Sequence, residues 1–321
     1  MTTTTSKPPS AWVFRSSNKT RTIDIDSAMA HHRPVVSVTT QDHHRFELID
    51  CGDPSCDHTL LFLPGLGITA RYLIGFGEAL AQHGIRLLIH EWRGNGSSNL
   101  RAARGQNWGY QALIAQDIHA ALQASSRLAG GPVAIGGHSL GAQLASIAAA
   151  LHPARVNRLL IIAGGTPYWR ALGGSMRIKI LMAAGLFSSL STIVGYLPGK
   201  RIGFGGREAR SVMTDWSRTI LTGQYLEPSQ HEDGRPATVE AALAELALPV
   251  LTLRMQDDHW VPQSSLDYLL GKMPQATVEQ RMIDAAAMQQ PADHFGWMNA
   301  PAQPADQIGQ WYQRSRDKIQ A

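Results

Sequence analysis

Short runs of apolar residues alternate along most of the chain with longer stretches in which apolar positions recur every three or four residues. The short runs lie at residues 59–63, 85–90, 132–136, 158–163 and 249–253, and the longer stretches lie at 70–83, 107–128 and 140–151. Short apolar runs are typical of strands that are buried on both faces, and the longer pattern is typical of amphipathic helices. The alternation therefore predicts an α/β fold, with a mostly parallel central sheet and helices on both of its faces.

The alternation stops after residue 163 and resumes only at residue 249, an interval that is too long for a bare loop in a compact domain. Helical patterns occur within it at residues 176–186, 207–221 and 239–246. We therefore interpret residues 166–248 as an inserted helical cap, and residues 1–165 together with 249–321 as the core. Before the first buried strand, residues 35–39 and 45–49 predict an antiparallel hairpin, and residues 305–319 predict a closing helix.

The composition narrows the class of protein. With 321 residues, 44% of them hydrophobic, the chain is long and apolar enough to bury a sizeable core, which excludes a disordered protein. Two cysteines, Cys51 and Cys56, cannot form a disulfide framework, and we expect both to be free thiols. The first ten residues do not form the apolar stretch of a signal peptide, so we expect a cytoplasmic enzyme.

Positive charge is concentrated in the predicted cap. The whole chain has a net charge of +4, whereas residues 166–218 contain eight basic and two acidic residues and have a net charge of +6. This local excess suggests that the segment meets an anionic ligand or surface. The chain lacks zinc-finger spacing, a basic zipper and an aromatic RNA-binding motif, so we do not expect it to bind nucleic acid.

Residues 180–197 contain no charged residue and are flanked by Lys179 and Lys200. Their length just reaches what is needed to span a bilayer, but Ser, Thr and Gly residues dilute the apolar character. We expect a buried or cavity-lining pair of cap helices here. Weak contact with an anionic membrane surface is the alternative, because the apolar segment lies among basic residues.

Gly137-His138-Ser139-Leu140-Gly141 fits the pattern G-x-S-x-G and follows an apolar strand. A helix rich in small residues follows it, which is the context that a nucleophile elbow requires. Glycines on both sides relieve the crowding of a sharp turn from strand to helix. The pattern predicts that the Ser139 hydroxyl is exposed above the sheet, close to a helix N-terminus that favours developing negative charge.

With this motif the chain resembles the α/β-hydrolase superfamily from about residue 35 onward. In that family a serine nucleophile, an acid and a histidine base follow in that order. The strand at residues 249–253 leads to Asp257-Asp258-His-Trp-Val-Pro262, which resembles the acid loop and aligns Asp258 with the acid; Asp257 is the alternative. Asp293-His294-Phe-Gly resembles the base loop and assigns the base to His294. The two loops together resemble a bacterial group of predicted α/β hydrolases.

The resemblance also implies an oxyanion hole made of two backbone N–H groups. One belongs to Leu140, which follows the nucleophile, and the other to Leu66, in the loop after the first central strand. Pro64-Gly65 stands there where family members often have His-Gly. Serine hydrolase chemistry implies neither an organic cofactor nor a metal. The histidine pairs at 31–32 and 43–44 lack metal-ligand spacing, and we expect them to be solvated surface residues.

These features together predict a serine hydrolase of carboxylic esters or thioesters, in which Ser139 forms an acyl-enzyme. An acyltransferase on the same scaffold and a non-catalytic binding protein are the alternatives. The apolar, basic cap suggests a small-molecule acyl ester or thioester as the partner, with the acyl group attached to an anionic carrier.

Overall fold

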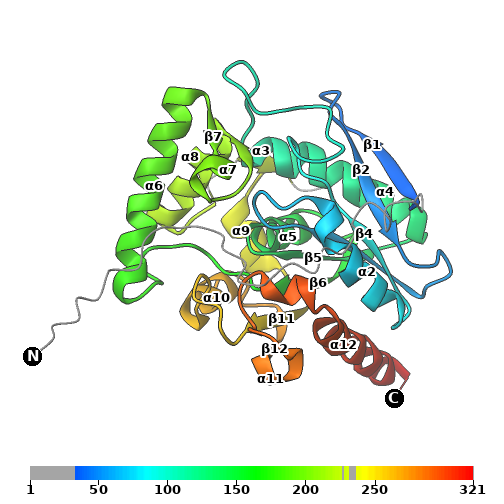
Figure 1. The fold of residues 1–321 in the computed structure, drawn as a ribbon. Helices are drawn as coiled ribbons and strands as arrows, with labels where there is room; N and C mark the ends of the chain where they lie inside the picture. Colours follow the sequence, from blue (N-terminus) through cyan, green and yellow to red (C-terminus); the bar gives the residue numbers. More distant parts are fainter. Residues whose placement is uncertain (1–32, 226–227, 231–235, 321) are drawn as a thin grey trace, which may run out of the picture.

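An eight-stranded mixed sheet forms the centre of the computed structural model, which describes residues 33–225, 228–230 and 236–320 (Figure 1). The strand order is β1-β2-β4-β3-β5-β6-β11-β12. The strands are β1 (Val35–Thr39), β2 (Arg45–Cys51), β3 (His58–Leu63), β4 (Ile85–Ile89), β5 (Val133–His138), β6 (Val156–Ile162), β11 (Pro249–Met255) and β12 (Thr277–Ile283). β1 and β2 form the expected hairpin, β2 pairs antiparallel with β4, and the strands from β4 to β12 pair in parallel. The predicted α/β fold is confirmed.

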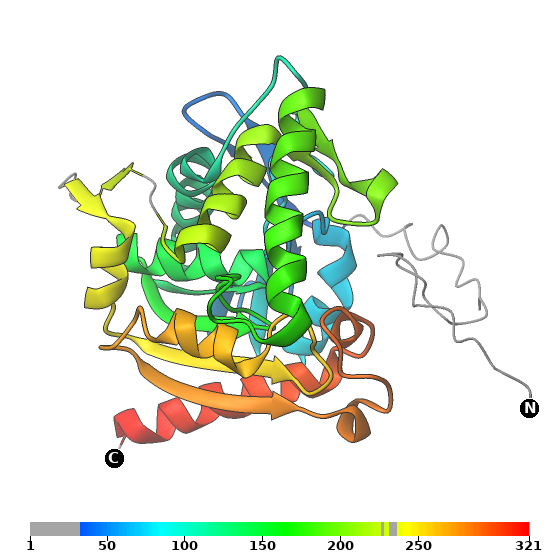
Figure 2. The ribbon, with the colours of Figure 1, turned by 90° about the vertical axis from the view of Figure 1, so that its left-hand side faces the viewer.

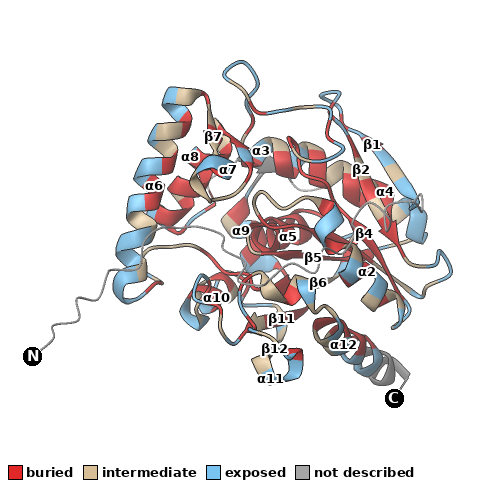
Figure 3. Ribbon diagram, in the orientation of Figure 1, coloured by how far each residue is buried: buried red, intermediate tan, exposed pale blue. Residues whose placement is uncertain are grey.

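Both faces of this sheet are buried, which explains the uninterrupted apolar runs in the sequence. Alternate residues of β3 enter two separate hydrophobic clusters, Leu61 and Leu63 on one face and Leu60 and Phe62 on the other. The first face is covered by α4 (His119–Ala129) and α5 (Leu140–Leu151), and the second by α2 (Ile74–Ala81) and α12 (Ala302–Gln320). Figure 3 shows α5 and the central strands as almost entirely buried.

Helix boundaries differ from the sequence patterns in two places. The helix expected over residues 107–128 begins at Tyr110 with the short α3 (Tyr110–Ala112), and a π-helical turn, Leu113–Ile118, joins it to α4. The helix expected over residues 70–83 begins as a 3-10 turn, Ala70–Leu73, and its α-helical part ends at Ala81. The remaining short helices outside the cap segment are α10 (Gln263–Leu270), α11 (Ala285–Met288) and the 3-10 turn Gly296–Asn299.

One strand of the sheet had no counterpart in the sequence interpretation. β12 lies at the edge of the sheet and has the sequence TVEQRMI, in which only Ile283 is buried. An edge strand with polar side chains lacks the apolar run that identifies the buried strands. Its parallel pairing with β11 nevertheless places the loop after β12 beside the loop after β11.

The segment between β6 and β11 lies over one end of the sheet, and Figure 2 brings it to the front. Its elements are α6 (Gly174–Val194), β7 (Tyr196–Pro198), α7 (Gly199–Ile202), β8 (Arg207–Ala209), α8 (Arg210–Thr222), β9 (Pro228–Gln230), β10 (Pro236–Thr238) and α9 (Val239–Glu245). The expected pair of helices over residues 180–197 is wrong, because one helix runs unbroken to Val194 and a short strand follows it. The division into core residues 1–165 and 249–321 and cap residues 166–248 stays a prediction.

Candidate active site

Ser139 occupies the turn between β5 and α5. Its backbone has φ 55° and ψ −118°, a conformation that costs about 1–3 kcal/mol for a residue with a side chain. The flanking glycines are required by sterics. A Cβ at Gly137 would lie 2.3 Å from the carbonyl carbon of Gly141, and a Cβ at Gly141 would lie 2.0 Å from the carbonyl oxygen of Leu63. The chain therefore turns sharply at Ser139 and presents its side chain to a cavity.

His294 connects Ser139 to Asp258 through two hydrogen bonds. Its Nδ1 lies 2.8 Å from Oδ2 of Asp258, and its Nε2 lies 3.0 Å from Oγ of Ser139. Asp258 is buried, and its other oxygen accepts hydrogen bonds from the backbone N–H groups of Trp260 and Val261, at 2.8 and 3.0 Å. A carboxylate held in this way orients Nδ1–H toward itself, which leaves Nε2 free to accept the Ser139 proton.

The neighbouring aspartate has a different partner. A carboxylate oxygen of Asp257 accepts the backbone N–H of Ala292 at 3.1 Å, and the Asp257 N–H donates to the Ala292 carbonyl at 2.9 Å. Asp257 therefore fastens the loop after β11 to the segment that leads to His294, whereas Asp258 contacts the imidazole itself.

His138, which precedes Ser139, also supports the base loop, a role that the sequence pattern did not reveal. Its Nε2–H donates to the backbone carbonyl of His294 at 2.8 Å, and the two rings lie tilted by 46° with their centroids 4.7 Å apart. Complete burial lowers the pKa of His138 well below its usual value, so the ring is neutral. A neutral ring fixes the position of His294 without placing a second positive charge beside it.

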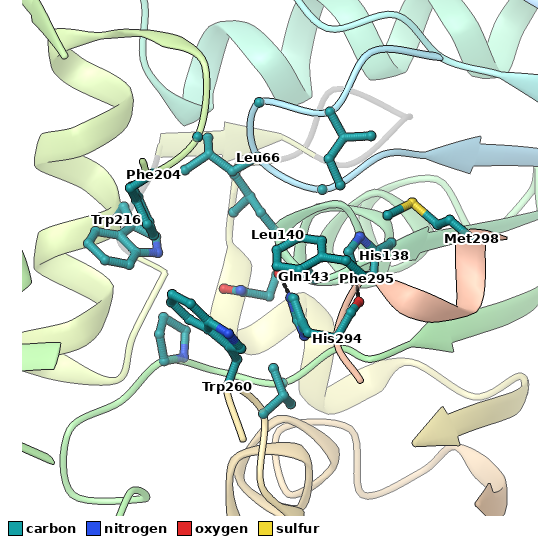
Figure 4. A pocket seen from close by; sticks show the side chains of 18 of the residues that line it. Leu66, His138, Leu140, Gln143, Phe204, Trp216, Trp260, His294, Phe295 and Met298 are labelled. Carbon is teal, nitrogen blue, oxygen red and sulfur yellow. Dashed lines mark hydrogen bonds between the residues drawn. The ribbon is translucent and has the colours of Figure 1, made fainter. Parts of the chain in front are cut away.

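The two residues whose backbone N–H groups are expected to form an oxyanion hole line the same cavity. Leu140 is the first residue of α5, where an N–H has no acceptor within the helix. Leu66 lies in the loop after β3, and the Trp92 indole N–H holds that loop by donating to the Pro64 carbonyl at 2.8 Å. Leu66 and Leu140 line the cavity together with Ser139 (Figure 4).

The cavity has a volume of about 420 Å³ and is mainly apolar and aromatic. Aromatic rings lead from the cap segment to the base: Phe204 lies 5.4 Å from Trp216 and 6.4 Å from Trp260, and Trp260 lies 6.2 Å from His294, between ring centroids. Figure 4 shows Phe204, Trp216 and Trp260 gathered on one side of His294. The lining also includes Ile180 of α6. No lysine or arginine of the described residues lines the cavity, so the basic cap residues lie outside it.

A second group of serine, histidine and aspartate lies in the core. Unlike Ser139, His294 and Asp258, it has no access to the cavity. His44 Nδ1 lies 2.8 Å from Asp117, and its Nε2 lies 2.9 Å from the Ser98 hydroxyl. Arg93 forms an ion pair with Asp117. His44 is fully buried, so its expected place on the solvated surface is wrong; His31 and His32 lie outside the described residues. This group lines no part of the cavity, and its contacts fasten the hairpin to the loop after β4.

The two cysteines are unpaired, with Cys51 buried and Cys56 half-buried. Burial raises the pKa of the Cys51 thiol to about 11, which makes it a poor nucleophile. Among the described residues, no group of three or more His, Cys, Asp or Glu side chains has the arrangement of a metal site.

Glu208 of β8 provides a pH-dependent contribution to stability. Burial raises its pKa from 4.5 to about 7, although the carboxylate accepts the Gly206 N–H at 2.6 Å. Between these two values the unfolded chain releases a proton that the folded chain keeps, so this glutamate lowers stability as pH rises from 4.5 to 7. Glu208→Gln has an amide that can still accept the Gly206 N–H but does not titrate. We expect its free energy of unfolding relative to wild type to increase by about 2 kcal/mol over this range.

Urea unfolding at a series of pH values measures this difference. Glu245→Gln on α9 is the matched control, because it makes the same change at an exposed position. The same pH dependence for both variants would contradict the prediction.

Comparison with known families adds a partial sequence match. The sequence model of a family described as serine aminopeptidase, S33, matches residues 54–193. The matched interval contains Leu66, Ser139 and Leu140, and it ends before Asp258 and His294.

Solved structures match over most of the chain. A carboxylesterase of the ammonia-oxidizing thaumarchaeon Nitrososphaera gargenis is 17% identical, with 89% of this chain and 100% of that one covered and a TM-score of 0.59. The esterase domain of a Rhodothermus marinus protein is 17% identical, with coverages of 88% and 99% and a TM-score of 0.57. A thioesterase domain from the curacin biosynthetic pathway is 17% identical, with coverages of 87% and 99% and a TM-score of 0.55. At this identity the likeness establishes a shared fold.

Proposed function

We propose that the chain is a serine hydrolase of the α/β-hydrolase superfamily, which cleaves carboxylic esters or thioesters through an acyl-enzyme on Ser139. The observation that carries this proposal is the hydrogen-bonded series from Ser139 through His294 to Asp258 at the wall of an apolar cavity. The esterase and thioesterase domains of the same fold support the two substrate classes.

In the proposed reaction the Ser139 oxygen attacks the carbonyl carbon of the substrate while Nε2 of His294 takes the hydroxyl proton. The oxyanion that forms accepts hydrogen bonds from the N–H groups of Leu66 and Leu140. When the intermediate collapses, His294 gives its proton to the departing alkoxide or thiolate. Water then repeats the sequence on the acyl-enzyme, with His294 again as base, and releases the acid. Asp258 keeps the imidazole in the required tautomer and stabilises its positive form.

The lining of the cavity supports an uncharged, apolar acyl group as its occupant, because aromatic and aliphatic side chains surround Ser139. The cations of the cap segment lie outside the cavity, so they could contact an anionic carrier only where it extends out of the cavity. We therefore propose that the acyl part determines binding within the site. A series of p-nitrophenyl esters from acetate to laurate tests this: kcat/KM is expected to rise with chain length until the cavity is filled.

Covalent labelling tests the proposed chemistry most directly. The full chain is incubated with a fluorophosphonate, its intact mass is measured and the adduct is mapped by peptide analysis. We expect one adduct on Ser139, lost in His294→Ala and kept in Ser98→Ala, because Ser98 belongs to the group without a cavity. Absence of any adduct would favour a binding protein instead. Transfer of the acyl group to added alcohol in preference to water would favour an acyltransferase.

Gly67, beside the proposed oxyanion donor, allows the cap segment to approach the loop after β3. Its φ is +74°, and a Cβ there would lie 2.3 Å from the backbone nitrogen of Gly206. Gly67→Ala is expected to displace the Leu66 N–H and to lower kcat by about 100-fold, since an oxyanion donor misplaced by 1 Å loses most of its effect. Gly131→Ala is the control, because a Cβ at Gly131 meets no atom within 4 Å. Equal kcat values for the two variants would contradict this assignment.

A further inference from the structure

α6 carries an exposed apolar stripe. Among the described residues, ten large hydrophobic side chains are exposed, and four of them lie on this helix with 62–70% of their surface accessible: Ile178, Met182, Leu186 and Ile193. At 3.6 residues per turn, these four positions fall within a quarter of the helix circumference. Exposed apolar side chains that are scattered singly are common, but a cluster of them on one helix face indicates a contact surface.

The opposite side of α6 belongs to the fold. Ala183, Ala184 and Phe187 are buried, and the Ser217 hydroxyl of α8 donates to the Ala184 carbonyl at 2.9 Å. Ile180 lines the cavity over Ser139. α6 is long and apolar enough to span a bilayer by length and composition, but a helix that packs against α8 on one side can meet lipid only on the other. Figures 1 and 2 show α6 as an outer element of the molecule.

Within residues 166–225, the described segment that contains α6, the exposed charges are all positive. Between residues 166 and 225 six cationic side chains are exposed, whereas the two acidic residues, Glu208 and Asp215, are buried. Arg177 and Lys179 lie at the N-terminal end of the stripe, and α7 follows its other end with two more cations. An apolar face bordered by cations has the composition of a helix that lies in the interface of an anionic bilayer. Two copies of the chain packed through this face would bring like charges together.

We propose that the outward face of α6, with the cations at its two ends, docks on anionic lipid surfaces. The apolar stripe enters the boundary between headgroups and acyl chains, and the lysines and arginines bind lipid phosphates. Docking in this way places α6, which contributes Ile180 to the cavity lining, against the membrane. The proposal concerns binding, so it stands or fails independently of the proposed hydrolase chemistry.

Vesicle flotation with the full chain tests this interaction. We expect wild type to float with vesicles of phosphatidylglycerol and phosphatidylcholine, and to bind vesicles of phosphatidylcholine alone at least tenfold more weakly. The triple variant Ile178→Ser, Met182→Ser, Leu186→Ser is expected to lose at least tenfold in binding to the anionic vesicles. None of the three residues lines the cavity, and circular dichroism with thermal unfolding checks that the variant is folded.

The matched control is Val35→Ser with Leu128→Ser, which removes two exposed apolar side chains from other parts of the surface and is expected to leave binding unchanged. Replacing Lys179, Lys200 and Arg201 by glutamine is expected to remove most of the preference for phosphatidylglycerol and most of the sensitivity to salt. Equal binding by wild type and the Ile178 triple variant would overturn the proposal. A concentration-dependent dimer that the same variant abolishes, without vesicle binding, would assign the face to a second copy of the chain.

Discussion

Replacing Ser139 by alanine is expected to lower kcat for ester hydrolysis by about 10⁵-fold, because no other group at the site can form the acyl-enzyme. The residual rate would come from the Leu66 and Leu140 N–H groups and from substrate binding. Hydrolysis of p-nitrophenyl butyrate by the purified full chain measures the effect. Thermal unfolding is expected to be little changed, since within the described part of the chain the Ser139 hydroxyl hydrogen-bonds to His294 alone, at the cavity wall.

Two further variants separate chemistry from folding. Ser139→Gly also removes the hydroxyl but relieves the positive φ, so we expect the same loss of activity with a thermal midpoint that is unchanged or higher. Ser98→Ala is expected to affect stability and not activity. It deprives the backbone N–H groups of Gly94 and Leu100 of their acceptor and lowers stability, with kcat kept within a few-fold. Activity of Ser139→Ala within tenfold of wild type would refute the proposed nucleophile.

The sequence was most informative where burial is complete. β3, β4, β5 and β6 are covered on both faces, so each appears as an apolar run, and α5 matches its predicted bounds of 140–151. The sequence was least informative where the environment is mixed. β12 is a polar edge strand, so it was missed. The apolar segment of α6 was expected to form a buried or cavity-lining pair of helices; Ile180 lines the cavity, but other apolar residues of the helix are exposed to solvent.

The candidate site shows the same division. The glycine pattern predicts Ser139, and the resemblance to the α/β-hydrolase superfamily predicts His294 from its place before the last helix. They cannot show that His138 contacts the base loop, since that contact joins residues 156 positions apart. They also give no sign that His44 is buried against Asp117, 73 positions away. The aromatic wall likewise combines Phe204 and Trp216 of the cap segment with Trp260 from the loop after β11, and only the fold brings these together.

Replacing the catalytic acid is the second change for which we expect a large loss of kcat, and it distinguishes Asp258 from Asp257. Asp258→Asn is expected to lower kcat by about 10⁴-fold near neutral pH. The amide oxygen accepts the Trp260 and Val261 N–H groups, so the amide NH2 faces Nδ1 of His294, favours the wrong tautomer and does not stabilise the positive form. Asp257→Asn keeps an oxygen that accepts the Ala292 N–H, so we expect kcat within a few-fold of wild type.

The two asparagine variants are a matched pair, since they make the same change at adjacent positions of one loop. Their kcat values, measured with p-nitrophenyl butyrate, test whether the hydrogen bond from His294 to Asp258 carries catalysis. Thermal unfolding shows whether each variant is folded. A large loss of kcat in Asp257→Asn with little change in Asp258→Asn would assign the acid to the other residue. That result would require His294 to leave the 2.8 Å contact seen here, because the Asp257 carboxylate is bonded to Ala292.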